Sequence, residues 1–357
     1  MAAITTVTTE NITPKTGEPN LSREICERNS TNHIYNDKIF SKSIIQNRAR
    51  QDACGYVHTE EMDVLWCSDS HGGHVDKKRY KIRDFLSTIS DEKWIEYVSQ
   101  ENFHIADKDE TTGGFKSNLF RDIASLGPFR DTGATLSIVK ISHSQIECYR
   151  VGDSPIYVFQ NDKNILYSNH DSEYNEDLKQ LKKRKNLKYV HPNNTSDNGV
   201  KDQSDIMPLS PTTMTQKPSH YIYWDSGTAT NMTRCIGHND PAAFQKRKEM
   251  ANKQVEVTLP CWTMTKNVIE YQPDIKVILA TDGLTAVCGE FDYPMMVASQ
   301  AAIDIMEVAY NRWRQEWGFN VQGFQQANSR IPDWNRDDVA IVSWQHLNPL
   351  RNEHNNI

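Results

Sequence analysis

Short apolar runs that end in polar turns dominate the hydrophobic pattern of this chain. Uninterrupted runs and period-two alternation both predict β-strands, and the pattern between residues 132 and 160 predicts an antiparallel meander. The clearest strand patterns cover residues 62–67, 135–141, 146–151, 155–160, 275–280 and 339–344. We therefore expect a protein built mainly on strands, several of them buried.

Helical periodicity appears in two other parts of the chain. The pattern predicts three helices that cover a sheet. The first covers residues 77–90, the second begins after Asp91 as its N-cap, and the third covers residues 115–126. Pro294 stands where a proline can open a helix, and the apolar positions in residues 296–313 predict one amphipathic helix of about six turns.

Polar segments divide the chain into an arm, a main domain and a tail. Residues 1–37 are rich in Thr and Asn and are expected to form a loosely ordered arm, followed by a domain at 38–346 and a tail at 347–357. Within the domain, a basic cluster and an Asn/Ser/Thr/Pro-rich run at about 178–220 predict a polar surface insertion. The basic cluster is either a solvated helix face or a docking surface for an anionic partner.

Composition and charge exclude several classes of protein. No apolar run approaches the ~18 residues that span a bilayer, and the N-terminal stretch lacks the features of a secretory signal. The net charge of −7 argues against nucleic acid as a partner. Seven cysteines without CxxC spacing predict reduced, structural thiols. We expect an intracellular, cytoplasmic protein with no membrane partner, and the pattern makes no prediction of oligomeric state.

Aspartates stand at the junctions of apolar strands and turns. Asp52, Asp69, Asp282 and Asp337 occupy such positions, and Asp153 is a fifth candidate. Each alone is an ordinary turn residue, but carboxylates gathered at one sheet edge repel one another unless cations neutralise them. Oxygen ligands suit Mg²⁺ or Mn²⁺, and two such ions about 3.5–4 Å apart can share a water and clamp a phosphoryl oxygen. The set therefore predicts hydrolysis of a phosphate ester.

Eight short motifs around these aspartates resemble, in the same order, those of the metal-dependent protein phosphatase 2C (PPM) family. One such motif is a weak signal, whereas eight in order are specific. The matching stretches, from about residue 48 to residue 344, are RxxQD at 48–52, DSHGG at 69–73 (family DGHGG), DTGAT at 131–135 (SGSTA), VGDS at 151–154 (VGDSR), SNHDS at 168–172 with NE at 175–176 (DHS…NE), TRCIG at 233–237 (TRALG), LATDGL at 279–284 (LASDGLWD) and RDDVAIV at 336–342 (RDNITVIV).

The resemblance implies both a fold and a reaction. The implied fold is α+β, a four-layer αββα sandwich of two antiparallel sheets flanked by helices, with residues 38–346 as the catalytic domain. The implied reaction is hydrolysis of phosphoserine and phosphothreonine in proteins by a water that bridges two Mg²⁺ or Mn²⁺ ions. Carried over residue by residue, the metal ligands would be Asp52, Asp69, the backbone carbonyl of Ser70, Asp282 and Asp337, with Asp153 at a third, weaker site.

Two further residues would act on the phosphate group. His71 matches the family's proposed general acid, which protonates the leaving oxygen, and its alternative is a turn histidine that faces water. Arg48 matches the phosphate clamp, but Arg50 competes because the spacing from Arg48 to Asp52 is one residue shorter than in the family. His74 has no family role and is expected to be exposed.

Departures from the family pattern leave a second interpretation open. Ala286 stands where the family has a second Asp that holds a third metal together with the match of Asp153, so this site is expected to be weakened or rebuilt. Gln51 replaces an acid, and Pro155 replaces the arginine of VGDSR. The alternative function is a catalytically weak or inactive pseudophosphatase that acts as a protein-binding or particle-associated module.

Overall fold

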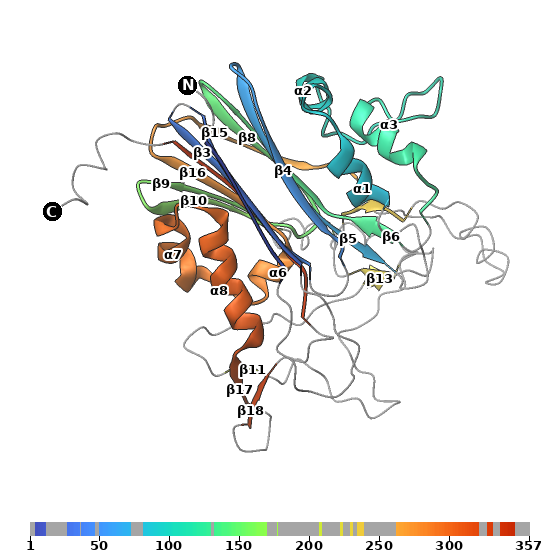
Figure 1. The fold of residues 1–357 in the computed structure, drawn as a ribbon. Helices are drawn as coiled ribbons and strands as arrows, with labels where there is room; N and C mark the ends of the chain where they lie inside the picture. The colour runs from blue at the N-terminus through green and yellow to red at the C-terminus, as the bar shows by residue number, and fades with distance from the viewer. Residues whose placement is uncertain are drawn as a thin grey trace, which may run out of the picture.

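Two antiparallel sheets stacked face to face form the centre of the molecule, with helices on both outer sides (Figure 1). The computed structural model describes residues 4–11, 27–35, 37–46, 50–72, 81–129, 132–169, 177, 207–208, 222–223, 229–230, 234–238, 262–320, 327–330 and 336–346. The predicted insertion at 178–220 lies outside these residues except for 207–208, and the predicted tail at 347–357 lies outside them entirely.

The first sheet has seven strands in the order β1-β2-β3-β19-β16-β9-β10, and every neighbouring pair is antiparallel. Its strands are β1 (Ile4–Asn11), β2 (Glu27–Tyr35), β3 (Lys38–Gln46), β19 (Val339–His346), β16 (Ile275–Ala280), β9 (Ile156–Gln160) and β10 (Lys163–Ser168).

The second sheet has the order β14-β6-β5-β7-β8-β15, with β4 also paired to β5, and is antiparallel throughout. Its strands are β14 (Ile236–Gly237), β6 (Thr132–Ala134), β5 (Met62–Gly72), β7 (Leu136–Ser142), β8 (Gln145–Val151), β15 (Thr265–Glu270) and β4 (Asp52–His58). The predicted meander is therefore only partly correct, because the chain crosses to the first sheet between β8 and β9.

Helices cover the outer face of each sheet. Figure 1 shows α1–α3 on one side of the sandwich and α7 and α8 on the other. The helical elements are α1 (Lys81–Thr88), α2 (Asp91–Ser99) and α3 (Asn118–Ser125) over the second sheet, and α6 (Asp282–Thr285), η3 (Glu290–Asp292), α7 (Tyr293–Ala298) and α8 (Ala302–Arg314) with the first. The predicted four-layer αββα sandwich is confirmed. Among the described helices, none has the length and apolar character needed to cross a membrane.

Short strands complete the described elements. One small sheet has the order β11-β17-β18, and a second pairs β12 with β13. Their bounds are β11 (Met207–Pro208), β17 (Glu316–Asn320), β18 (Ala327–Arg330), β12 (Ile222–Tyr223) and β13 (Ala229–Thr230).

Alternating side chains of the central strands supply two of the core layers. In β16, Ile275, Val277 and Leu279 pack between the two sheets, whereas Ile278 and Ala280 pack toward the helices outside the first sheet. Because both faces of the strand are covered, it is apolar at every position except Lys276. Cys54, Cys67 and Cys148 pack between the two sheets, and Cys288 packs outside the first sheet. Cys235 is also buried.

The polar N-terminal stretch, for which a loosely ordered arm was predicted, contributes two strands at residues 4–11 and 27–35. β2 pairs with β3 along its whole length, and β1 pairs with β2. Backbone hydrogen bonds hold such strands even where one face meets water. The Ser30 hydroxyl lies 2.9 Å from that of Ser43, a polar contact within this hairpin. The boundary predicted at residue 37 therefore cuts through a hairpin.

Two details of the helices also differ from the prediction. Ser90, not Asp91, is the N-cap of α2, and its side chain accepts a hydrogen bond from Lys93 N. The predicted six-turn helix is broken into α7 and α8, because the carboxylate of Asp304 accepts from the backbone N–H groups of residues 300 and 301 and starts a new helix there. Pro294 lies in the first turn of α7, as predicted.

Candidate functional site

The five predicted aspartates converge at one end of the sandwich. Asp52 begins β4 and pairs in register with Asp69, near the end of β5. Asp282 begins α6 directly after β16, Asp337 directly precedes its neighbour β19, and Asp153 lies in the crossing from β8 to β9. The charges of the other four all raise the pKa of Asp69, so the five carboxylates lie within electrostatic range of one another.

Thr281 ties the two sheets together at this end. Its hydroxyl donates to Asp52 Oδ2 at 2.5 Å and accepts from Ala340 N at 2.9 Å. Its own backbone N–H donates to the carbonyl of Ala340 at 3.0 Å. One side chain therefore fixes the Asp52 carboxylate of the second sheet against β16 and β19 of the first. The sequence analysis did not single out Thr281, and its only signal was its place directly before Asp282.

Asp69 is held in a similar way by hydroxyl groups. Asp69 N donates to Thr135 Oγ1 at 2.9 Å, and Thr135 N donates to the carbonyl of Asp69 at 2.8 Å. The hydroxyls of Thr135 and Ser154 lie 2.5 Å apart, which connects β5 to the turn that carries Asp153. These bonds position the backbone at both aspartates before any ligand binds.

Burial and mutual repulsion disfavour the charged forms of these carboxyl groups. Burial, and then the neighbouring carboxylates, raise the pKa values of Asp52 and Asp69 well above their usual range. Burial and the charge of Asp153 raise the pKa of Asp282 to about 7. Burial and the charges of Asp282 and Asp338 raise the pKa of Asp337 to about 8. Such a cluster is stabilised either by protons or by bound cations.

Asp338 belongs to the same cluster, although the sequence analysis named it only within a motif. Its side chain is 1% exposed, and its Oδ2 accepts a hydrogen bond from Gln51 N at 2.8 Å. Its charge raises the pKa of Asp52, after burial as the first cause. The signal that could have found it is its place beside Asp337 at the entrance to a buried strand.

The donor atoms fit hard divalent cations. Asp282 Oδ1 is buried and has no hydrogen-bond partner within the described part of the chain. Ser70, whose backbone carbonyl is a predicted ligand, lies in β5 next to Asp69, and its N–H donates to the carbonyl of Gln51 at 3.1 Å. Clustered carboxylate and carbonyl oxygens are the ligands that Mg²⁺ and Mn²⁺ prefer.

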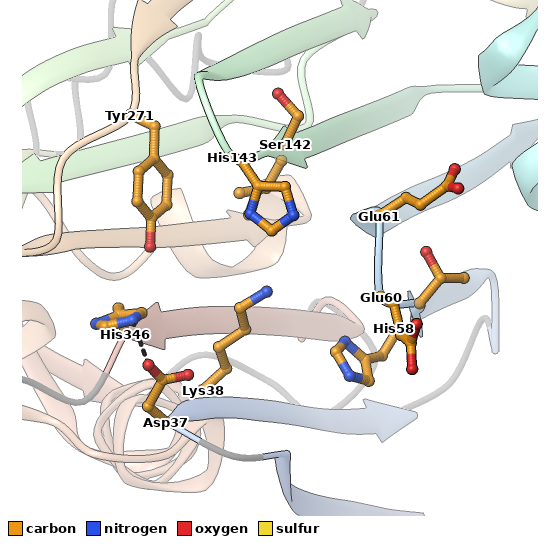
Figure 2. A pocket seen from close by; sticks show the side chains of 11 residues that line it. Asp37, Lys38, His58, Glu60, Glu61, Ser142, His143, Tyr271 and His346 are labelled. Atoms are coloured by element: carbon orange, nitrogen blue, oxygen red, sulfur yellow. Dashed lines mark ion pairs between the residues drawn. The ribbon is translucent and has the colours of Figure 1, made fainter.

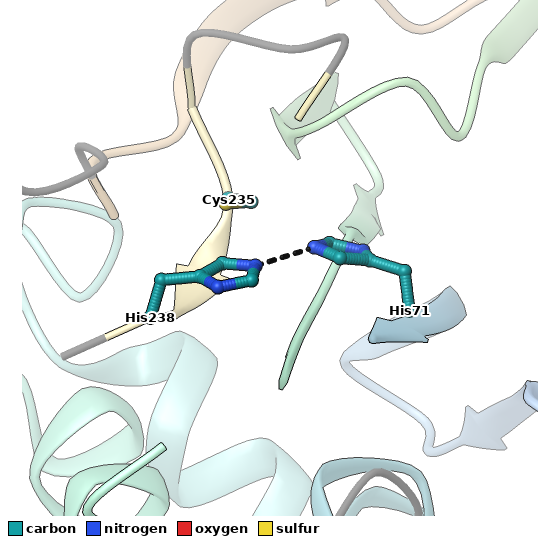
Figure 3. Close-up of side chains that lie close together, drawn as sticks. All are labelled: His71, Cys235 and His238. Atoms are coloured by element: carbon teal, nitrogen blue, oxygen red, sulfur yellow. Dashed lines mark hydrogen bonds between the residues drawn. The ribbon is translucent and has the colours of Figure 1, made fainter. Parts of the chain in front are cut away.

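His71 follows the carboxylates on β5 and contacts a second histidine (Figure 3). The Nε2 atoms of His71 and His238 lie 3.0 Å apart, and the two rings are stacked at 21°. Burial lowers the pKa of His71 to about 4, so its imidazole is neutral at pH 7. His71 is part of strand β5 rather than a turn, and its partly exposed ring packs on His238. The sequence analysis missed His238, which directly follows the TRCIG motif.

The two arginine candidates remain predictions. Arg48 lies outside the described residues, as does His74. Arg50 is exposed with φ of 54°, and its carbonyl accepts a hydrogen bond from Arg83. Ala286 ends α6, donates its N–H to the carbonyl of Asp282 at 2.8 Å and packs against the apolar layer of the first sheet.

Replacing Gly283 with alanine is expected to lower the free energy of unfolding by about 1–3 kcal/mol, the usual cost of overpacking. A Cβ at Gly283 would lie 1.9 Å from the carbonyl oxygen of Asp338, so the two aspartate-bearing turns would have to separate. Urea denaturation measures the change. Gly289→Ala is the matched control, since no atom lies within 4 Å of its Cβ position. Equal midpoints for the two variants would contradict the close approach of these turns.

The described residues also line two hollows, one away from the carboxylate cluster and one that reaches it at Asp52. One of about 420 Å³ lies at the opposite end of the sandwich, where β4 ends and β5 begins (Figure 2). Its charged groups pair locally, as His346 Nε2 with Asp37 Oδ2 at 2.7 Å. The other, of about 610 Å³, runs from Asp52 along β4 toward α1 and α2, and Arg83 contributes to its lining.

Comparison with known proteins gives structural likeness only. No family model and no curated protein sequence matches the chain. Many similar solved structures are Ser/Thr phosphatases of the 2C or PPM type. Serine-threonine phosphatase 2C from Toxoplasma gondii is 10% identical, with 95% of this chain and 98% of that chain covered and a TM-score of 0.42.

Two further solved structures show the same range of similarity. The Mycobacterium tuberculosis Ser/Thr phosphatase PstP/Ppp is 11% identical to this chain, with a TM-score of 0.40. The match covers 97% of this chain and 99% of that chain. A sex-determining protein of C. elegans is 14% identical with a TM-score of 0.47, and the match covers 88% of this chain but only 65% of that protein. Because these TM-scores are below 0.5, the activity has to be argued from the residues of the site itself.

Proposed function

We propose that the chain is a Mg²⁺- or Mn²⁺-dependent phosphatase that hydrolyses phosphoserine and phosphothreonine in proteins. The observation that supports this most strongly is the convergence of five aspartates, whose burial and mutual charges raise the pKa values of Asp52, Asp69, Asp282 and Asp337. A site that served only stability would not gather carboxylates that repel one another, because each costs free energy when it ionises. Clustered carboxylates of this kind are well suited to hold divalent cations next to a phosphate ester.

The proposed ligands come from both sheets. Asp52, Asp69 and the backbone carbonyl of Ser70 would hold the ions from the second sheet, and Asp282 and Asp337 from the first. When bound, the two ions supply an attacking water of lowered pKa and neutralise charge on the phosphoryl group. Asp153 would face a third ion, which we expect to bind weakly because Ala286 offers no carboxylate.

Residues of the chain would carry out the other steps. The Thr281 hydroxyl holds the Asp52 carboxylate in one orientation, so little reorganisation is needed when the ions bind. Arg48, or Arg50 in its place, would bind phosphate oxygens through its guanidinium group. His71 would donate a proton to the leaving serine or threonine oxygen. Because burial lowers the pKa of His71 to about 4, the protonated imidazole that donates would be a minor species at pH 7.

Removing the divalent cations is expected to abolish hydrolysis of a phosphothreonine peptide by the purified chain. Phosphate release is measured with Mn²⁺, with Mg²⁺ and with excess chelator, and turnover should return when Mn²⁺ is added back. Undiminished turnover in chelator would contradict the metal-dependent reaction. A folded chain that is inactive with both ions would support the alternative of a pseudophosphatase, in which the same fold acts by binding other proteins.

A further inference from the structure

We propose that His71, Cys235 and His238 form a second metal site, specific for one Zn²⁺ ion, beside the carboxylate cluster. The candidate ligand atoms of these three residues all lie within 4.8 Å of one another. Figure 3 shows the two imidazole rings facing each other, with Cys235 on the strand that leads to His238. Cys235 and His238 are 0% exposed, and His71 is partly exposed, so the group is buried on one side and open on the other.

Cys235 and His238 form a local pair of ligands on one short segment. They flank β14, a two-residue strand, and are three positions apart in the sequence. The backbone at His238 adopts φ of 50°, and its N–H donates to the carbonyl of Thr132 at 3.0 Å. Trp262 Nε1 donates to the carbonyl of Gly237 at 3.1 Å, which anchors the segment from the other side. The turn that brings both side chains together is therefore fixed by the fold.

The third ligand is brought in by the register of the second sheet. Strand β6 lies between β5 and β14, and Gly133 on β6 is the register partner of both His71 and Gly237. A Cβ at Gly133 would lie 2.7 Å from His71 Nε2 and 2.8 Å from a ring carbon of His238. Only glycine leaves room for the two rings to meet above the middle strand.

The donor set differs from that of the neighbouring carboxylates and selects a different ion. Two imidazole nitrogens and a thiolate suit Zn²⁺, whereas carboxylate and carbonyl oxygens suit Mg²⁺ and Mn²⁺. Zn–N bonds of about 2.0–2.1 Å place two nitrogens about 3.3 Å apart in a tetrahedral site. The observed 3.0 Å between the Nε2 atoms is close to this separation. Three protein ligands leave the fourth position open to water or to a substrate oxygen.

One consequence of this site rests on the proposed function. A Zn²⁺ ion on His71 would occupy the imidazole that we propose as the proton donor of the phosphatase. Zn²⁺ would then inhibit hydrolysis while Mg²⁺ or Mn²⁺ remained on the aspartates. The site would make the enzyme sensitive to zinc through residues that do not hold the catalytic ions.

Cobalt binding to the full-length chain tests the site without reference to activity. The protein is stripped with chelator, saturated with Mg²⁺ and titrated with Co²⁺. The proposal predicts a thiolate-to-cobalt absorption band in the near ultraviolet that saturates at one Co²⁺ per chain and is removed by one equivalent of Zn²⁺. Absence of the band in the wild-type protein would overturn the proposal and leave a hydrogen-bonded histidine pair as the account of this cluster.

Matched cysteine variants assign the band to its ligand. Cys235→Ser should lose the band and weaken Zn²⁺ binding by at least about 10-fold. Replacing a residue that only hydrogen-bonds to a metal ligand already weakens metal binding by about 10–100-fold, and Cys235 is proposed as a ligand itself. Cys288→Ser, which replaces another buried free cysteine in a different core layer, should keep the band. If Cys235→Ser does not fold, His238→Gln provides the same comparison. A band of full intensity in folded Cys235→Ser or His238→Gln would overturn the assignment.

An inhibition assay connects the site to the proposed function. Zn²⁺ is titrated against phosphothreonine peptide hydrolysis in excess Mn²⁺, and the half-inhibiting concentration should be at least about 10-fold higher for Cys235→Ser than for Cys288→Ser. A cobalt band in a chain without phosphatase activity would support the zinc site and contradict the proposed function. Phosphatase activity in a chain without the band would contradict the zinc site alone.

Discussion

Asp282→Asn is expected to lower kcat for phosphothreonine peptide hydrolysis by about 10²–10³-fold or more, the cost of removing one group that stabilises charge in a transition state. Asp282 carries a buried oxygen with no hydrogen-bond partner in the described part of the chain and lies among four other carboxylates. Asparagine has nearly the same shape but no charge to hold a cation. Steady-state kinetics with saturating Mn²⁺ measures the loss.

The stability of the same variant separates loss of function from loss of fold. Burial and the charge of Asp153 raise the pKa of Asp282 to about 7, so its ionisation at pH 8 costs the folded, metal-free chain free energy that the unfolded chain does not lose. Asp282→Asn should therefore melt at a higher temperature than the wild type in chelator at this pH. Asp107→Asn, at an exposed loop position, is the control and should change neither kcat nor the melting temperature. Full activity of Asp282→Asn in saturating Mn²⁺ would contradict its role as a ligand.

The metal-free chain is expected to lose stability as the pH rises from about 5 to 9. Asp282 and Asp337 have folded-state pKa values of about 7 and about 8, above the usual aspartate value near 4. The stability that each proton contributes is fully present below the unfolded-state pKa and is lost as the pH rises through the folded-state pKa. Each group can add a slope of up to about 1.4 kcal/mol per pH unit between these limits.

Urea denaturation across this pH range, in chelator and in Mn²⁺, measures the effect. Mn²⁺ should remove most of the decline, because a cation that binds only the folded chain stabilises the ionised carboxylates. Asp282→Asn should flatten the profile in chelator, whereas Asp107→Asn should leave it unchanged. A profile in chelator that is flat, or identical with and without Mn²⁺, would show that these carboxylates do not repel one another in the folded chain.

The architecture was predictable where burial alone decides the sequence. Strand β16 was predicted with its observed bounds because both its faces are covered, which requires an apolar residue at every position except Lys276. The strands of residues 1–37 were missed because β1, at the edge of the sheet, and its neighbour β2 are held by backbone hydrogen bonds, which leave no hydrophobic pattern. The break between α7 and α8 was missed because it depends on one local capping interaction of Asp304.

The candidate site was predictable in its aspartates but not in the contacts that hold them. An acid at the end of a buried strand can be recognised in the sequence, and a set of such acids indicates cations. Thr281 contacts Asp52 across 229 positions of sequence, and His71 contacts His238 across 167. No spacing rule connects residues so far apart, because their contact depends on the order and register of strands in two sheets.

Anomalous diffraction from crystals grown in Mn²⁺ tests the central claim most directly. The account predicts two strong manganese peaks among Asp52, Asp69, Asp282 and Asp337, at about 2.0–2.2 Å from carboxylate oxygens, as hard divalent cations require. Asp282→Asn crystals should lose at least one of them. Crystals without manganese between these aspartates, or with a single ion bound only at an exposed carboxylate, would contradict the claim that the end of the sandwich is a two-metal phosphatase centre.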